Sequence, residues 1–204
     1  MKIAKNEDRR TRKTKKALRE ALVSLLHEKN IQKITVRELT DKADIHRSTF
    51  YANFKDVYEL YDHMEAAMIQ EISDIISADY AFKSDVFFIK LLDYINNNRE
   101  ISRLFFGGNI SPSLYERLTG LFRDSFVECW SKEYDVAGVS EEMDYCVQYC
   151  LSGSLGVVGL WVLRDFVYPP EKLVAMLSEI ETGVGKIFQT DSEEKITCSH
   201  CRQN

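Results

Sequence analysis

Four consecutive polar residues carry the strongest chemical signal in this sequence. They are His46, Arg47, Ser48 and Thr49. Each side chain can donate a hydrogen bond in some protonation state, and Tyr51 and Lys55 follow with a hydroxyl and an ammonium. Donors of this kind suit the acceptors on nucleic-acid bases and phosphates. An arginine can bind guanine O6 and N7 in a bidentate pair or contact only a phosphate, and the sequence leaves both open for Arg47.

Three glycines at a spacing of three residues, Gly153, Gly156 and Gly159, suggest a phosphate-binding loop. No strand is predicted before them, and no Lys-Ser or Lys-Thr pair follows, so that interpretation is disfavoured. Small residues on one helix face instead favour the close approach of another helix. That helix can belong to a second copy of the chain or to the same chain, and the sequence leaves both alternatives open.

The five cysteines offer no complete metal or redox site. Cys146 and Cys150 share a helix face at i, i+4, where burial as small apolar side chains is the commoner use. Cys198, His200 and Cys201 supply at most three ligands, whereas a structural zinc site needs four. No Ser-His-Asp arrangement, acid pair or nucleotide-binding fingerprint stands out. We therefore predict no metal, no cofactor and no enzymatic activity.

The sequence before the polar cluster predicts two helices. Apolar residues recur at helical spacing over roughly 10–28, and the polar face of that helix is basic. Thr35 and Glu38 have the spacing of a capping box, which starts a second helix that ends near Asp44. Aspartate tolerates the left-handed conformation of a tight turn.

A third helix is expected over 46–53, with Phe50 and Phe54 as a buried i, i+4 pair beside it. Helix, turn and helix in this order form the helix-turn-helix plan. The second helix of that plan enters the major groove, and its first residues meet the base edges. The polar cluster therefore lies where base contacts are made.

Longer helices are predicted for the rest of the chain. Their expected positions are 56–77, 84–97, a short helix near 101–105, a helix capped by Ser113, a helix over 141–165 capped by Ser140, and a last helix from Pro170. No strand is predicted, so the fold class is all-α. We predict a helix-turn-helix domain at 1–55, a helical domain at 56–190 and a disordered tail at 191–204.

Charge is distributed unevenly over the 204 residues. Residues 1–55 hold 15 Lys and Arg against 7 Asp and Glu, a balance of +8. Residues 56–204 hold 12 against 25, a balance of -13, and the net charge of -5 hides this difference. The basic part suits phosphate contact, whereas the acidic part would be repelled by nucleic acid. We therefore expect DNA to dock through one basic face.

Composition excludes several protein classes. Hydrophobic residues make up 45% of the chain with only 3 Pro and 9 Gly, which is typical of a globular rather than a disordered or loop-rich protein. No run of about 18 apolar residues is present, so we predict no membrane span, and the basic N-terminus lacks the apolar run of a secretory signal. An odd number of cysteines favours free thiols in a reducing compartment. The predicted location is therefore the cytoplasm.

The segment from Thr35 to Asp56 resembles the helix-turn-helix of TetR/AcrR-family transcriptional regulators. The likeness lies in the initiating threonine, the turn Ala43-Asp44-Ile45-His46 and the run Thr49-Phe50-Tyr51-Ala52-Asn53-Phe54-Lys55-Asp56. Asp44 replaces the usual turn glycine and His46 replaces the usual capping serine, so we expect His46 to face a phosphate or a base. The residues that we assign to DNA binding on this basis are Thr35, Arg37, His46, Arg47, Ser48, Thr49, Tyr51 and Lys55.

The resemblance implies a homodimer that binds a palindromic operator and responds to a ligand, with repression as the family default. The C-terminal part is similar to the subgroup of dihydroxyacetone-kinase regulators, in which activators also occur. This weaker likeness lies in Tyr94-Ile95-x-x-Asn98-Arg99 and Leu151-Ser152-Gly153-x-x-Gly156.

The same resemblance implies a ligand cavity and a dimer interface among the C-terminal helices. The residues assigned to ligand contact are Phe105, Trp130, Tyr145 and Tyr149. Those assigned to the dimer interface are Gly153, Gly156, Leu160, Leu173, Leu177 and Ile180. Two other interpretations stay open. One is a helical ligand-binding protein or enzyme with a basic N-terminus, and the other is a DNA-binding dimer without a small-molecule effector.

Overall fold

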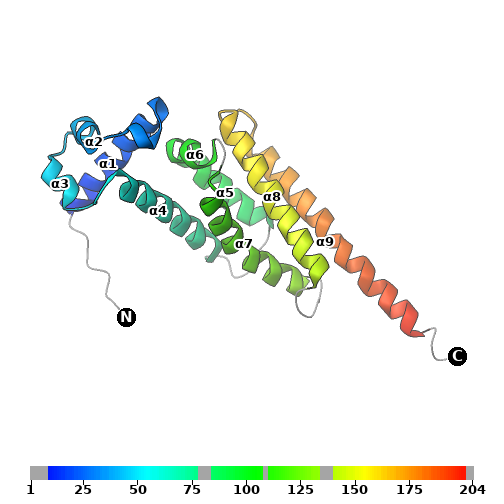
Figure 1. The fold of residues 1–204 in the computed structure, drawn as a ribbon. Helices are drawn as coiled ribbons and strands as arrows, with labels where there is room; N and C mark the ends of the chain where they lie inside the picture. Colours follow the sequence, from blue (N-terminus) through cyan, green and yellow to red (C-terminus); the bar gives the residue numbers. More distant parts are fainter. Residues whose placement is uncertain (1–8, 78–83, 108–109, 134–139, 201–204) are drawn as a thin grey trace. The chain divides into compact units, whose positions relative to one another are not determined.

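A computed structural model describes residues 9–77, 84–107, 110–133 and 140–200, with the side chains of the last helix described as far as Ile187 (Figure 1). Every regular element in these ranges is helical, as the sequence predicts. The helices are α1 (Arg9–Glu28), a 3-10 turn (Ile31–Lys33), α2 (Val36–Ala43), α3 (Arg47–Tyr51), α4 (Val57–Ser77), α5 (Ser84–Asn97), α6 (Arg99–Phe106), α7 (Pro112–Glu133), α8 (Glu141–Leu163) and α9 (Pro170–His200).

The chain forms two compact units, Met1–Met68 and Ile69–Asn204, which we call the N-terminal and C-terminal units. The boundary falls inside α4 rather than at residues 55 and 56, where the sequence divides by charge. One continuous helix therefore supplies its first part to the N-terminal unit and its last part to the C-terminal unit.

The N-terminal unit is built around the apolar face of α1. Leu18 and Leu22 are fully buried, and α2 packs on this face through Leu39, which is also fully buried. An ion pair between Lys42 and Glu28, with nitrogen and oxygen 2.9 Å apart, joins the ends of α2 and α1. Hydrophobic burial thus fixes the position of α2, while partly exposed ion pairs add little to the free energy of folding.

Local capping explains where two helices of the C-terminal unit begin. The Ser140 Oγ accepts a hydrogen bond from the backbone N–H of Met143 over 3.1 Å, as predicted for the start of α8. The predicted cap Ser113 is wrong for α7. Ser111 performs that function, because its Oγ accepts from the N–H of Leu114 over 3.1 Å and Pro112 occupies the first helical position.

Helix α8 is apolar around most of its circumference. By length and composition it could cross a membrane, with a mean hydropathy of 1.6 over its most apolar window, although core helices of soluble proteins share this property. Eight of its residues are buried in the C-terminal unit, including Val147, Leu151 and Trp161. A helix that is apolar on its outer face as well needs a second covering surface.

The connection between α8 and α9 holds α6 in place. Asp165 and Phe166 both have left-handed backbones, with φ of 58° and 59°, a conformation that costs free energy for residues other than glycine. The guanidinium groups of Arg99 and Arg103 of α6 lie 4.7 and 5.4 Å from the Phe166 ring centroid, and Arg103 pairs with Asp165 over 2.5 Å. Trp161 contacts the same phenyl ring edge-on. These contacts compensate the strained backbone and hold α6 against the end of α8.

Helix α9 continues through residues 191–200, which the sequence predicts as a tail. The side chains of Cys198 and His200 and the whole of Cys201 lie outside the described residues.

Candidate nucleic-acid interface

Thr35 and Glu38 form half of the predicted capping box. The Thr35 Oγ1 accepts a hydrogen bond from the N–H of Glu38 over 3.2 Å and so caps α2. The Glu38 carboxylate turns instead to Lys29 at the end of α1, and this hydrogen bond lowers the pKa of Glu38. The start of α2 is therefore fixed from both sides, with the Thr35 side chain exposed.

The turn after α2 depends on a left-handed aspartate. Asp44 has φ 53° and ψ 47°, as the sequence predicts, and forms the C-cap of α2. The N–H of Ile45 then donates to the carbonyl of Thr40 over 3.0 Å. The Thr40 hydroxyl is buried and donates to the carbonyl of Val36 over 2.8 Å. This turn sets the direction in which the next helix leaves.

Replacing Asp44 with glycine should stabilise the protein, and replacing it with alanine should destabilise it. Glycine adopts the left-handed conformation without strain, whereas alanine tolerates this conformation less well than aspartate does. We expect a gain of about 0.5 kcal/mol for Asp44→Gly and a loss of about 1 kcal/mol for Asp44→Ala in the free energy of unfolding. Urea denaturation followed by circular dichroism measures both. The two variants remove the same carboxylate, so equal stabilities would contradict the assignment to backbone strain.

Aromatic packing anchors the short helix α3. Phe50 is fully buried and Phe54 is 3% exposed, with ring centroids 6.0 Å apart. The Asn53 Nδ2 donates to the carbonyl of Thr49 over 2.7 Å, which satisfies a backbone acceptor near the end of this helix. A helix of five residues is not stable alone, so the buried phenyl rings hold it in place.

The anchored helix leaves its polar start in solvent. His46, Arg47 and Ser48 are exposed, and His46 makes no side-chain hydrogen bond to cap α3, in agreement with the weak cap that the sequence predicts. Neither the Arg47 guanidinium nor the Lys55 ammonium has a hydrogen-bonding or ionic partner among the described residues. Both cations are therefore available to a negatively charged ligand.

The remaining predicted DNA-binding residues lie on the surface of the same unit. Tyr51 is 59% exposed and packs edge-on against Phe50. Arg37 is exposed and lies 3.7 Å from Asp41, an ion pair weak enough for phosphate to displace. Thr49 is half-buried, which suits the packing function that the resemblance implies for it.

Two hollows flank the start of α3. The first lies beside the turn and is lined by Thr40, Asp41, Asp44, Ile45, His46 and Arg47. The second is a groove between α1 and α3, lined by Arg10, Thr11, Thr14, Ser48, Thr49, Ala52 and Asn53. Hydroxyl, amide and guanidinium groups in one groove suit a phosphate. Sequence reasoning noticed Arg10 only within a basic run and missed Thr11, Thr14 and Asn53, because their closeness to α3 depends on the packing of α1.

The predicted dimer residues fall into two groups in the C-terminal unit. Gly153, Gly156, Leu160 and Ile180 are exposed, and Leu160 and Ile180 are 46% and 44% exposed. Leu173 and Leu177 are instead buried at 4% and 3%, because α9 packs against α5 and α8 of the same chain through them. Exposed apolar residues of α9 that sequence reasoning missed are Met176 and Ile187.

The three glycines of α8 also divide by environment. A Cβ built on Gly153 or Gly156 would meet no described atom within 4 Å outside its own helix, whereas one on Gly159 would lie 3.3 Å from the carbonyl oxygen of Phe106. Gly159 therefore permits the approach of α6 within the chain. Gly153 and Gly156 have no such neighbour within the part of the chain that the structure describes, so close approach of a second chain is the alternative that their positions favour.

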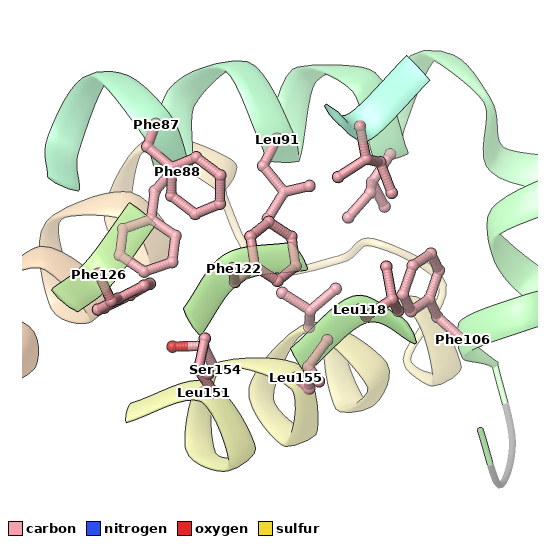
Figure 2. Close-up of a pocket in the computed structure, with 13 residues that line it drawn as sticks. Phe87, Phe88, Leu91, Phe106, Leu118, Phe122, Phe126, Leu151, Ser154 and Leu155 are labelled. Carbon is pink, nitrogen blue, oxygen red and sulfur yellow. The ribbon is translucent and has the colours of Figure 1, made fainter. Parts of the chain in front are cut away.

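An apolar cavity lies inside the C-terminal unit between α5 on one side and α7 and α8 on the other (Figure 2). Its lining residues are Ile72, Phe87, Phe88, Leu91, Ile95, Phe106, Leu118, Phe122, Phe126, Leu151, Ser154, Leu155 and Val158.

None of the four residues predicted for ligand contact belongs to this lining. Phe105 and Trp130 are buried elsewhere in the unit, at 3% and 1% exposure. Tyr145 and Tyr149 are 70% and 64% exposed, on the outer face of α8 that also carries Gly156. The i, i+4 spacing correctly places the two hydroxyls on one face, but it does not reveal that this face points away from the core.

The described residues contain no group of three His, Cys, Asp or Glu side chains that could hold a metal ion. Cys150 is buried, and burial together with the negative charge of Glu181 raises the pKa of its thiol to about 12. The thiol therefore stays protonated at neutral pH, which suits a packing residue rather than a redox centre.

Comparison with known proteins agrees with these features. Residues 83–183 match the family model TetR_C_8, described as a transcriptional regulator C-terminal region. No curated protein sequence matches the chain.

Solved structures of transcriptional regulators share the fold. The dihydroxyacetone kinase operon activator DhaS aligns with a TM-score of 0.63 and 19% identity, over 86% of this chain and 97% of that one. A TetR transcriptional regulator from Streptococcus agalactiae 2603V gives 0.63 and 21%, over 85% and 96%. The fatty acid degradation regulator FadR from Bacillus halodurans gives 0.63 and 14%, over 88% and 97%. The solved structures share the all-helical fold, and by the match of residues 83–183 to the C-terminal family model the chain belongs to the TetR family of transcriptional regulators.

Proposed function

We propose that this protein is a homodimeric, ligand-responsive repressor that binds a palindromic operator in double-stranded DNA. The observation that carries the proposal is the exposed start of α3, where His46, Arg47 and Ser48 face solvent above an aromatic anchor. In a helix-turn-helix these positions meet base edges in the major groove. Thr35, Arg37, Tyr51 and Lys55 then contact phosphates on either side, with Thr49 holding the helix start.

The groove between α1 and α3 extends the proposed contact. Arg10, Thr11 and Thr14 of α1 face Ser48 and Asn53 across it. A phosphate bound there would accept hydrogen bonds from two helices at once and so fix the angle at which α3 enters the groove of DNA.

The proposed dimer forms through the outer faces of α8 and α9, which lie side by side (Figure 1). Tyr149, Gly153, Gly156, Leu160 and Leu163 are exposed along α8. Met176, Ile180 and Ile187 follow at helical spacing along α9. Two copies of this surface related by a two-fold axis would bury the apolar residues in a four-helix arrangement. Such a partner surface explains why α8 is apolar on both faces.

The proposed response to a ligand uses α4. Ile72 lines the apolar cavity and lies on the same helix whose first residues, from Val57, follow the DNA-binding segment. A ligand that prefers one position of Ile72 would shift the population of α4 conformations and thereby the affinity for DNA.

Two other functions have less support. A helical ligand-binding protein or enzyme would not need the exposed cluster at 46–48. A DNA-binding dimer without an effector would not need the cavity. The proposed protein acts in the cytoplasm, away from membranes, and catalyses no reaction. Both proposals agree with membership of a family of transcriptional regulators.

The test begins with the full-length protein and sheared DNA from the source organism. Fragments retained by the protein should share one palindromic site. A labelled duplex with that site is then titrated by fluorescence anisotropy at several salt concentrations. Because each neutralised phosphate contributes about -0.9 to the slope of log K against log salt, contacts from two protomers should give a slope of about -4 or steeper. A flat salt dependence would refute DNA binding, and a reporter gene that is silent only without the protein would refute repression.

A further inference from the structure

The apolar cavity of the C-terminal unit has chemistry that restricts its ligand. Of its thirteen lining residues, twelve are aliphatic or aromatic and Ser154 alone carries a polar side chain. None is charged. Figure 2 shows the Ser154 hydroxyl at the α8 wall, with the phenyl rings of Phe87, Phe88 and Phe126 gathered at one end.

Walls of this kind exclude charged and polyhydroxylated ligands. A carboxylate or phosphate taken from water into this space would find no cation or set of N–H donors to replace its hydration. A polyol would leave all but one of its hydroxyls unpaired. Hydrocarbon, by contrast, gains free energy from leaving water and finds aromatic and aliphatic partners on every side.

The space is also elongated. Lining residues on α5 run from Phe87 to Ile95, and those on α7 run from Leu118 to Phe126, so each wall extends for about 12 Å along its helix. The cavity has a volume of only about 20 Å³, so its own side chains fill most of the space between the helices. A single hydroxyl cannot satisfy a water there, so the cavity is suited to being dry.

Phenyl rings control the width of this space. Phe87 of α5 meets Phe122 of α7 edge-to-face with centroids 5.3 Å apart. Turning either ring about its side-chain torsions would widen the space between α5 and α7. An apolar chain that enters must therefore displace these rings.

We propose that the cavity binds a neutral, elongated apolar molecule with at most one hydroxyl-sized polar group, which Ser154 binds. The inference rests on the proposed function, since it names the chemical class of the effector. It excludes acids, phosphorylated metabolites and polyols as ligands of this cavity. Occupancy reaches the DNA-binding unit through Ile72 of α4.

The test uses four probes with full-length protein: 1-decanol, decanoate, 1,10-decanediol and glycerol. The first two share one chain and differ in charge, and the diol adds a polar group at the far end. Isothermal titration calorimetry should give a dissociation constant for 1-decanol at least about tenfold lower than for decanoate or the diol, because the buried charge or second hydroxyl has no partner. Thermal denaturation should show a rise in Tm with 1-decanol and none with glycerol.

Two variants test whether 1-decanol binds in this cavity rather than elsewhere on the protein. Ser154→Leu occupies the space with an isobutyl group and should abolish the Tm shift by 1-decanol, measured against the same variant without ligand. Phe122→Leu widens the space and should lower the dissociation constant of 1-dodecanol relative to that of 1-decanol. The second variant serves if the first does not fold.

Three outcomes would overturn the proposal. They are tighter binding of decanoate or glycerol than of 1-decanol, no binding of 1-decanol, or unchanged 1-decanol binding in both variants. Operator affinity measured on the same samples separates the two proposals. Binding of 1-decanol without any change in DNA affinity would retain the ligand class and refute its regulatory use, whereas a protein that binds no DNA would refute the proposed function and leave the ligand result intact.

Discussion

Replacing Arg47 and Lys55 together with alanine should weaken operator binding by at least about 100-fold at physiological salt. A bidentate contact between arginine and guanine is worth about 1–3 kcal/mol, and a dimer loses it twice. Each lost lysine–phosphate contact also removes about 0.9 from the salt slope, so the slope should become shallower by about 2 for the dimer. Fluorescence anisotropy with the mapped operator at three or more salt concentrations measures both quantities.

The matched control for this variant replaces two basic residues of the C-terminal unit. Arg117 and Lys132 are exposed on α7, and their double replacement with alanine removes the same charge from the chain. Operator affinity should stay within about twofold of the wild type, because neither residue belongs to the proposed DNA-contacting set and surface charges are screened over about 8 Å at physiological ionic strength. Equal losses in the two double variants would show that net charge, rather than the surface around α3, governs binding.

The single variants then separate the two functions open to Arg47. If Arg47 reads a guanine, Arg47→Ala lowers affinity for the operator more than for unrelated DNA and relaxes the base preference at one position in each half-site. If it contacts only phosphate, both affinities fall together. Lys55→Ala should lower both in every case.

Gly156→Leu should convert the protein into a monomer. In a two-fold interface the new side chain appears twice, and overpacking costs about 1–3 kcal/mol for each copy. The dimer dissociation constant should therefore rise by about 30-fold to 20,000-fold. Sedimentation velocity across a range of protein concentrations measures this change. Operator affinity should fall with it, because a monomer offers only one recognition helix.

The structure makes this variant selective for the partner. A Cβ on Gly156 meets no described atom within 4 Å beyond its own helix, so the protomer itself accommodates the leucine. Removal of a glycine from a helix also favours the helical state by up to about 1 kcal/mol. The substitution should therefore not destabilise the fold of the single chain, and any fall in Tm should come from the loss of the dimer contacts.

Gly120→Leu is the matched control. Gly120 is exposed on α7, and a Cβ there also meets no described atom within 4 Å outside its helix. This variant should remain dimeric with unchanged operator affinity. An intact dimer for Gly156→Leu, or dissociation of both variants, would refute the proposed interface.

Most elements of the fold could be predicted because their signals are local. Ser140 caps α8 because its hydroxyl accepts a hydrogen bond from the N–H of the residue three positions later. Asp44 adopts a conformation that is set by its own backbone torsions. Such features depend on neighbours along the chain, so the sequence displays them directly. Even the failure at Ser113 is small, since the true cap Ser111 lies two residues earlier and precedes a proline.

The candidate sites divide in the same way. The start of α3 was predictable because one short segment contains its polar residues, its turn and its aromatic anchor. The groove with Thr11, Thr14 and Asn53 was not, because it forms between α1 and α3, which are distant along the chain.

By itself, the sequence determined the helices, the turn at Asp44, the basic character of residues 1–55 and the spacing of residues on each helix face. Only the tertiary structure decided which faces point inward, because helical periodicity defines a face without specifying what covers it. Leu173 and Leu177 point into their own chain, whereas Tyr145 and Tyr149 point out of it. The lining of the apolar cavity therefore comes from five different helices, α4 to α8, a set that no single segment contains.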